Sequence, residues 1–297
     1  IPLSSGSTSI GIVADESIHS YQTINTFDRA REWLKKHEPQ CSEMVENNIN
    51  SFQDFHSLKH FSFSCKKLYS EDGWCLTGDA GMFLDPLYSP GSDFVGINNG
   101  FITDIISKYL QGQNISQEVR IHELSFRSIF AGFLPIYQNQ YPTMANSKVM
   151  SAKFIWDLMM YWGGIGPIYF NQKLIDINFM ESVRPILTNF FLLNIRMQDL
   201  YRSWAALDDD KKYPQGIFLD YAELPILQQL NSDLLENKAD DILLVQLQLN
   251  VKSAHELADE ICQEAFNDYP ELEYARANSP LSPSSHLKEF FDEFTVC

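Results

Sequence analysis

The sequence is poor in basic residues, and it contains no long uninterrupted hydrophobic run. Lysine and arginine number 22 against 39 aspartates and glutamates, which gives a net charge of −17. Such an acidic surface repels phosphate backbones and anionic lipids, so we expect no nucleic-acid partner and no membrane association. The most apolar stretch, residues 154–170, is interrupted by Asp157 and by glycines and a proline, so it is too broken for a membrane span.

Cysteine is also scarce. The five cysteines are spread along the chain without a C-x-x-C pair, which argues against a disulfide framework and for a reducing compartment. No signal sequence is recognisable, so we expect a soluble, cytoplasmic protein. His56 and His60 lack the adjacent glutamate and the third ligand of a zinc site, and we expect no metal. Because the chain begins with Ile1-Pro2 rather than with methionine, we expect it to be part of something longer.

Local patterning divides the chain into two parts. In the first part, Thr26 is a candidate N-cap for a helix. The expected strands cover 7–14, 61–69 and 74–77, and the expected helices cover 26–37, 41–49 and 93–110. We predict a mixed α/β unit over residues 1–112.

Helical periodicity dominates the second part, which we predict as a mainly α-helical region over residues 113–297. The expected helices cover 117–131, 149–162, 182–205, 223–236 and 239–267. A possible strand at 216–219 and a linker at 279–284 complete the expectation.

One helical segment is rich in aromatic residues and methionine. Its large side chains either line a substrate pocket or, as such spacing more often indicates, fill the core. They are Trp156, Met159, Met160, Tyr161 and Trp162. The glycines that follow, at 163–166, predict a helix break.

The run at residues 73–93, GWCLTGDAGMFLDPLYSPGSD, carries the chemistry. An expected strand delivers Asp79 into a loop whose flanking glycines, Gly78 and Gly81, allow a ligand to approach the backbone closely. The carboxylate of Asp79 suits hydrogen bonds from ligand hydroxyls, and strand ends are where α/β sheets place ligands. The alternative is that Asp79 simply caps a turn.

The same run leads into the helix expected from residue 93. Pro86 and Pro90 stiffen the loop, and Pro90-Gly91 is typical of a type II turn. Ser92 or Asp93 is the expected N-cap. The free N–H groups of the first helical turn favour an anionic or electron-rich group there.

This run resembles the second cofactor motif of FAD-dependent oxidoreductases of the hydroxybenzoate-hydroxylase type, and in particular that of flavin-dependent tryptophan halogenases. The resemblance implies part of an FAD-binding fold, followed here by the helical region. It also implies that FAD is the cofactor and that Asp79 binds its ribityl chain, while the 89–93 turn faces the isoalloxazine. The residues implied in cofactor binding are Gly78, Asp79, Ala80, Pro86, Gly91 and Ser92.

Three departures from the halogenase pattern refine this resemblance. No G-x-G-x-x-G follows a strand, so the ADP-binding unit of the family is absent from this chain. Pro90 stands in the middle of the halide-binding loop and has no N–H, which favours oxygenation over halogenation. Tyr88 stands where tryptophan halogenases have glutamate, which favours phenolic, pyrrolic or carrier-bound substrates over free tryptophan.

The resemblance therefore implies a flavin-dependent monooxygenase or halogenase-like oxidoreductase. Its substrate is an electron-rich small molecule or a carrier-bound group, and an NAD(P)H-dependent flavin reductase is its expected partner. No catalytic residue is identified, and Tyr88 and Ser89 are weak candidates. The alternative is a non-catalytic helical interaction module with a vestigial flavin loop.

Overall fold

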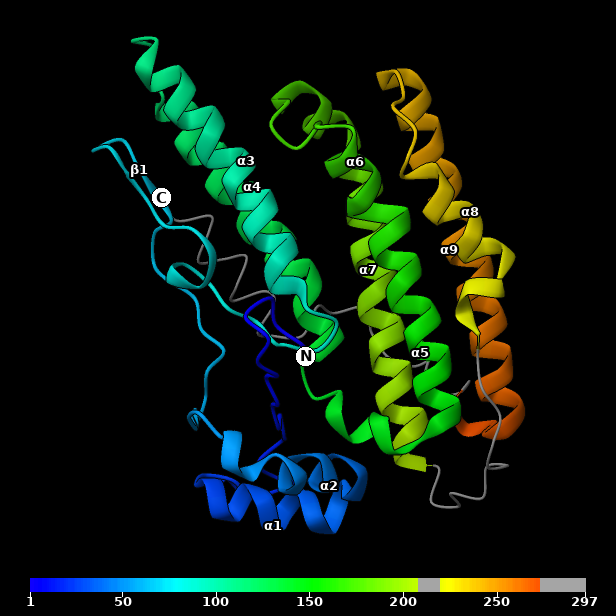
Figure 1. Cartoon of the computed structure of the whole chain (residues 1–297). Helices are drawn as coiled ribbons and strands as arrows, with labels where there is room; N and C mark the ends of the chain where they lie inside the picture. The colour runs from blue at the N-terminus through cyan, green and yellow to red at the C-terminus, as the bar shows by residue number, and fades with distance from the viewer. Residues whose placement is uncertain (208–219, 273–297) are drawn as a thin grey trace.

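The computed structural model describes residues 1–207 and 220–272, and these residues form a mostly helical structure (Figure 1). The strand expected at 216–219 and the linker expected at 279–284 lie outside the described residues.

A pair of short helices opens the structure. Helix α1 (Phe27–His37) and helix α2 (Pro39–Asn47) lie crosswise to the long helices in Figure 1. The prediction of Thr26 as N-cap is confirmed, because its hydroxyl accepts a hydrogen bond from the Arg29 N–H at 3.4 Å. The apolar face of α1 is buried through Ala30 and Leu34.

The sheet content is smaller than the sequence predicts. Strand β1 (Tyr69–Ser70) pairs with strand β2 (Trp74–Cys75) in an antiparallel hairpin, and these are the strands of the described residues. Of the strand expected over 61–69, the structure keeps β1 and one isolated bridge between Phe63 and Phe83. The mixed α/β prediction for the first part is therefore wrong in its sheet content.

The strand expected over 7–14 is also absent. This segment makes a single bridge, between Pro2 and Thr8, and its apolar residues Ile10 and Val13 are exposed. An alternating pattern stabilises a strand through burial and cross-strand packing, and no neighbouring strand supplies either here.

Helices of different lengths make up most of the remaining structure. Their bounds are α3 (Pro90–Leu110), α4 (Ser116–Tyr137), α5 (Ser147–Met160), α6 (Gly166–Phe170), α7 (Ile177–Leu207), α8 (Pro225–Asp233) and α9 (Asp240–Asp268). Short 3-10 turns cover Tyr21–Thr23, Ile49–Ser51, Gly78–Ala80, Tyr141–Ala145 and Tyr221–Glu223. Helix α3 packs on α4, and α7 packs on α4, α5 and α9. The helices expected from periodicity are present, with shifted ends.

Two apolar clusters hold these helices together. The first joins β1, α3, α4 and α6 to the N-terminal halves of α7 and α9. The second joins α5 and α8 to the C-terminal halves of α7 and α9, around the fully buried Trp156 and Trp204. Since the first cluster contains residues from both sides of position 112, α3 packs directly on the helical region. The division into two domains there stays a prediction.

The glycine-rich segment after α5 does not break the helix, contrary to the expectation. It forms a π-helical turn, Tyr161–Ile165, which continues directly into α6. A side chain at Gly163 would lie 3.2 Å from Met159 Cε, and the Asn250 amide of α9 donates to the Gly163 carbonyl at 2.9 Å. Crowding against the Met159 side chain therefore accounts for the glycine, while the Asn250 hydrogen bond ties the turn to α9.

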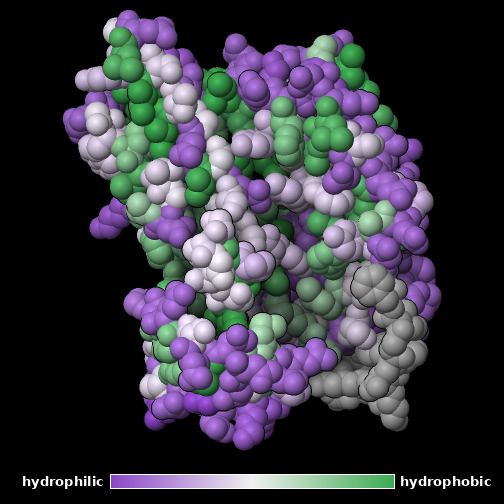
Figure 2. Space-filling model, in the orientation of Figure 1, coloured by the Kyte–Doolittle hydropathy of each residue, from purple (hydrophilic) through white to green (hydrophobic). Residues whose placement is uncertain are grey.

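Figure 2 shows hydrophilic residues over the α1–α2 pair and hydrophobic residues near the free end of the α3–α4 pair. Ile106, Tyr109 and Leu110 are the exposed apolar residues at that end of α3. Among the described residues, no helix combines the length and the apolar character that crossing a bilayer requires.

Candidate functional site

The glycine-rich run of the sequence forms a tight turn against the side of α3. Gly78 adopts φ +55, and a Cβ there would lie 3.3 Å from Val95 Cγ2. Thr77 Oγ1 donates to Asn99 Oδ1 at 2.7 Å. The run is therefore fastened to α3 beyond its first turn, and glycine at position 78 satisfies both the left-handed backbone and the close approach.

The start of α3 differs from the prediction. The helix begins at Pro90, so the predicted start at Asp93 and the predicted caps Ser92 and Asp93 are wrong. Pro90 occupies a first-turn position, where its fixed φ suits the helix and its missing N–H costs nothing. Tyr88 and Ser89, which precede it, both have left-handed backbones, at φ 61 and φ 57. Bulky residues adopt this conformation only where the surrounding structure holds them in it.

The first turn of α3 has room for a ligand group. Ser89 stands at the N-cap position but makes no side-chain capping hydrogen bond. At Gly91, no heavy atom lies within 4 Å of the place where a Cβ would stand. An uncapped helix start with an open approach suits an anionic or electron-rich group. This turn therefore has room for the predicted contact with the pyrimidine side of a flavin, and that contact stays a prediction.

Asp85 holds the loop between the glycine-rich turn and the start of α3. Its Oδ1 accepts hydrogen bonds from the Leu87 N–H at 2.8 Å and from the Tyr141 hydroxyl at 3.0 Å. Burial raises the pKa of Asp85, and these two hydrogen bonds oppose that shift. Asp85 thereby ties the loop that contains Pro86 to the turn that follows α4.

The structure does not bring all the predicted cofactor residues together. Asp79, Ala80, Pro86 and Ser92 are exposed to solvent. No hydrogen bond joins the Asp79 carboxylate to another described residue. None of these four residues lines the cavity described next, so their role in cofactor binding stays a prediction.

A cavity of about 270 Å³ lies between the start of α3, the C-terminal half of α4 and the end of α5. Its walls are mostly aromatic. The lining residues are Tyr88, Pro90, Asp93, Phe133, Ile136, Tyr137, Phe154, Asp157, Leu158, Tyr161 and Trp162. Of the predicted site residues, Tyr88 belongs to this lining.

The aromatic segment of α5 is divided between the core and the cavity. Trp156 and Met159 are fully buried in the second apolar cluster, while Tyr161 and Trp162 line the cavity. The core interpretation is confirmed for Trp156 and Met159, while a substrate-binding role of Tyr161 and Trp162 stays a prediction. Tyr161 and Trp162 belong to the π-helical turn.

Two carboxylates face this aromatic lining. Burial raises the pKa of Asp93, and a hydrogen bond from Tyr161 opposes the shift. Burial also raises the pKa of Tyr88, and the charge of Asp157 and a hydrogen bond to it raise that pKa further. The cavity thus combines apolar walls with a small number of hydrogen-bonding groups, as ligand pockets generally do.

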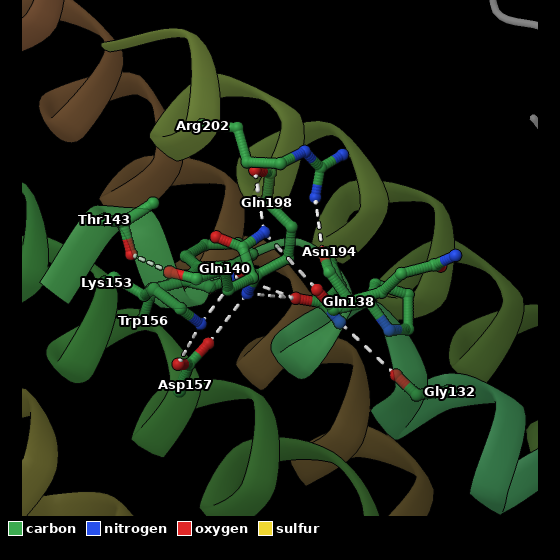
Figure 3. Close-up of polar contacts among 11 residues, drawn as sticks. Gly132, Gln138, Gln140, Thr143, Lys153, Trp156, Asp157, Asn194, Gln198 and Arg202 are labelled. Atoms are coloured by element: carbon green, nitrogen blue, oxygen red, sulfur yellow. Dashed lines mark hydrogen bonds and ion pairs between the residues drawn. The ribbon is translucent and has the colours of Figure 1, made fainter. Parts of the chain in front are cut away.

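Asp157 belongs to a buried polar network beneath the cavity (Figure 3). Lys153 Nζ donates to Asp157 Oδ2 at 2.6 Å and to Gln198 Oε1 at 2.9 Å. Gln198 Nε2 donates in turn to Asp157 Oδ1 at 2.7 Å. Asn194 Oδ1 accepts from Gln198 and from Trp156 Nε1, at 3.1 and 3.0 Å. The network joins α5 to α7.

The members of this network have ionisation properties typical of a desolvated ion pair. Lys153 is 0% exposed, and burial lowers its pKa while the Asp157 charge raises it. Burial raises the pKa of Asp157, and Lys153, Gln198 and Tyr88 oppose that shift. Three donors on one carboxylate favour its ionised form.

Sequence analysis did not identify this network. The available signal was the charge at Asp157 inside the most apolar stretch, four residues after Lys153 and hence on the same helical face. Gln198 lies on a different helix, so its place in the network follows from tertiary packing.

Metal ligands do not gather in the structure. Within residues 1–207 and 220–272, no group of three or more histidine, cysteine, aspartate or glutamate side chains is arranged to hold a metal ion.

Comparison with known proteins connects the chain with halogenases. It is 21% identical to flavin-dependent halogenase chlA of Dictyostelium discoideum over 176 residues, which are 58% of this chain and 29% of that protein. It is 30% identical to a 1H-pyrrole-2-carbonyl-(peptidyl-carrier protein) brominase of Pseudoalteromonas luteoviolacea over 115 residues, which are 38% of this chain and 28% of that protein.

The chain thus spans less than a third of the length of these relatives. No protein-family profile matches it, and no solved structure matches it. The similarity is distant and partial, and it supports a halogenase-like flavoenzyme as the kind of protein.

Proposed function

We propose that this chain is the flavin-facing and substrate-facing part of an FAD-dependent, halogenase-like oxidoreductase. The observation that carries the proposal is the open, uncapped start of α3 at Gly91, which directly borders an aromatic cavity at Tyr88 and Pro90. The similarity to the flavin-dependent halogenase supports it independently. Within the proposal, the unit that binds ADP lies outside this chain.

The residues of the chain have distinct roles in this proposal. The N–H groups of the first turn of α3 stabilise negative charge on the flavin ring system, because a helix N-terminus carries a partial positive charge. The exposed Asp79 carboxylate accepts hydrogen bonds from the ribityl hydroxyls, with Gly78 and Ala80 allowing close approach. Reduced FAD, when bound, supplies the activation of O₂ with which an electron-rich substrate is oxygenated or halogenated.

The loop before α3 and the walls of the cavity also bear on the proposed reaction and substrate. Pro90 has no N–H to offer a halide, which favours oxygenation. The aromatic walls suit a flat, electron-rich ring. The name of the brominase relative describes a carrier-bound pyrrole, so a carrier-bound substrate is included beside free small molecules. An NAD(P)H-dependent reductase is the proposed source of reduced flavin.

The decisive experiment uses the whole translated product of the gene, which we expect to purify as a yellow protein with flavin absorbance. Asp79→Ala is expected to lower the flavin content severalfold while leaving the far-ultraviolet circular dichroism unchanged, because this carboxylate makes no hydrogen bond or ion pair with another described residue. Asp54→Ala, which also removes an exposed carboxylate, is the matched control and is expected to keep the flavin.

A colourless product that neither binds added FAD nor consumes O₂ with reduced flavin refutes the proposal. That result favours the helical interaction module instead. Product mass spectra recorded with bromide present separate the two reactions, since a brominated product overturns the preference for oxygenation.

A further inference from the structure

The cavity already holds a phenol ring on a buried acceptor. Asp157, at its inner end, is 5% exposed, whereas Tyr88, at its mouth, is 37% exposed. Tyr88 and Asp157 both line the cavity, and the Tyr88 hydroxyl is close enough to the Asp157 carboxylate for each group to shift the pKa of the other. The Tyr88 ring lies 5.7 Å from the ring of Phe154 and 6.4 Å from that of Tyr137. The site thus accommodates an aromatic ring beside Asp157.

The backbone conformation at Tyr88 is unfavourable for a tyrosine. Its φ of 61 lies in the left-handed region, and so does the φ of 57 at Ser89. This conformation costs a tyrosine free energy that a glycine would not lose. Because the Tyr88 side chain is already partly exposed, it can move into solvent when a ligand takes its place in the cavity.

Charge decides which ligand suits the acceptor. Lys153 Nζ lies 2.6 Å from Asp157 Oδ2, so the pair has no net charge whichever of the two groups holds the proton. A neutral ligand that donates one hydrogen bond keeps this balance. An anionic ligand is repelled by the two carboxylates that line the cavity, Asp157 and Asp93.

We propose that Asp157 is the residue that binds the O–H or N–H donor of a neutral aromatic ligand, in the place that the Tyr88 hydroxyl occupies in this structure. Lys153 and Gln198 are positioning residues, because they donate hydrogen bonds to the two oxygens of the carboxylate and fix its orientation. This inference rests on the proposed function only in taking the cavity as the substrate site, and it is tested by binding, without flavin.

The test compares three small probes on the purified chain by isothermal titration calorimetry. The first, p-cresol, is the tyrosine side chain cut at Cβ. The second, 4-methylanisole, has nearly the same shape but no donor, and the third, 4-hydroxyphenylacetate, adds a negative charge. Because hydrogen bonds to charged groups are strong, we expect p-cresol to bind about tenfold or more tightly than either of the other probes.

Variants at the mouth test displacement. Tyr88→Phe removes the competing hydroxyl and is expected to tighten p-cresol binding severalfold, while 4-methylanisole binding changes little. Tyr88→Gly removes the ring and suits the left-handed backbone, so a larger gain for p-cresol is expected. An increase in melting temperature with added p-cresol provides an independent readout for this variant.

Variants at the inner end test the acceptor. Asp157→Asn is expected to reduce the preference for p-cresol over 4-methylanisole to about twofold or less, since the charged acceptor is lost. Asp93→Asn alters the other carboxylate of the same cavity and is the matched control, which should keep the preference. If Asp157→Asn does not fold, the binding of p-cresol and 4-methylanisole to Tyr88→Phe still tests the inference, because this variant removes only the hydroxyl oxygen of a partly exposed side chain.

Two results overturn the inference. One is equal affinity for p-cresol and 4-methylanisole in the unaltered chain and in Tyr88→Phe. The other is no binding of any probe to either the unaltered chain or Tyr88→Gly. Loss of flavin binding in the whole gene product with the p-cresol preference intact refutes the proposed function alone, so the two failures are distinguishable.

Discussion

Replacing Lys153 by methionine tests how strongly the buried network is desolvated. Methionine has a similar length and fills the apolar surroundings, but it leaves the Asp157 carboxylate, 4% exposed, without its counter-charge. Gln198 Nε2 at 2.7 Å remains as a donor, and Gln198 Oε1 loses its partner. Removing one member of a buried ion pair costs about 3–5 kcal/mol, so we expect Lys153→Met to lower the free energy of unfolding by that amount.

The loss should depend on pH in a definite direction. Burial raises the pKa of Asp157 above its ordinary value of 3.8, and without Lys153 the opposing charge is gone. The folded variant then binds a proton more readily than the unfolded chain, so its stability improves as the pH falls. Urea unfolding at about pH 7.5 and about pH 5 should show a smaller deficit at the lower pH.

A double-mutant cycle separates charge from shape. Lys153→Met combined with Asp157→Leu replaces the pair by apolar side chains, and its loss should be well below the sum of the two single losses. A deficit below about 1 kcal/mol for Lys153→Met alone, with no pH dependence, would refute the reasoning, because surface ion pairs behave in that way.

Three further predictions concern other parts of the fold. Burial lowers the pKa of His122 below 6.5, so the unfolded chain takes up a proton first as the pH falls. In urea unfolding between about pH 7.5 and 5.5, the stability of the unaltered chain should therefore fall more steeply than that of His122→Gln. Parallel curves would contradict this prediction. Thr26→Ala removes the acceptor for the Arg29 N–H and should cost about 1 kcal/mol in thermal unfolding, whereas Thr26→Ser should cost less. Asn250→Ala leaves the Gly163 carbonyl without this donor and should cost about 1–3 kcal/mol in urea; an unchanged midpoint would show that water replaces the amide.

Helix positions were predictable because their signals are local. The apolar spacing along α3 and α4 and the cap at Thr26 each depend on residues close together in sequence. The strand expected at 7–14 failed for the opposite reason, since a strand requires a partner that lies elsewhere in the chain. The start of α3 failed because Pro90-Gly91 suits both a type II turn and a first helical turn, and the sequence does not distinguish them.

The cavity was only partly predictable. Tyr88 precedes α3, Tyr137 ends α4 and Tyr161 follows α5, so their proximity in the cavity results from tertiary packing. The charge at Asp157 was visible in the sequence as an interruption of an apolar stretch. Its partner Lys153 and the role of Gln198 required the structure, because burial decides whether such a pair is solvated or isolated from water.

The π-helical turn at Tyr161–Ile165 has a consequence for how this chain tolerates length changes. A π turn accommodates one more residue than an α-helical turn over the same rise. Deleting a single residue there would let the segment wind into regular helix, while α5 and α6 would keep nearly their present relative orientation. The side chains within the turn would be redistributed, so the wall of the cavity at Tyr161 and Trp162 would change while the packing of the next helix is retained.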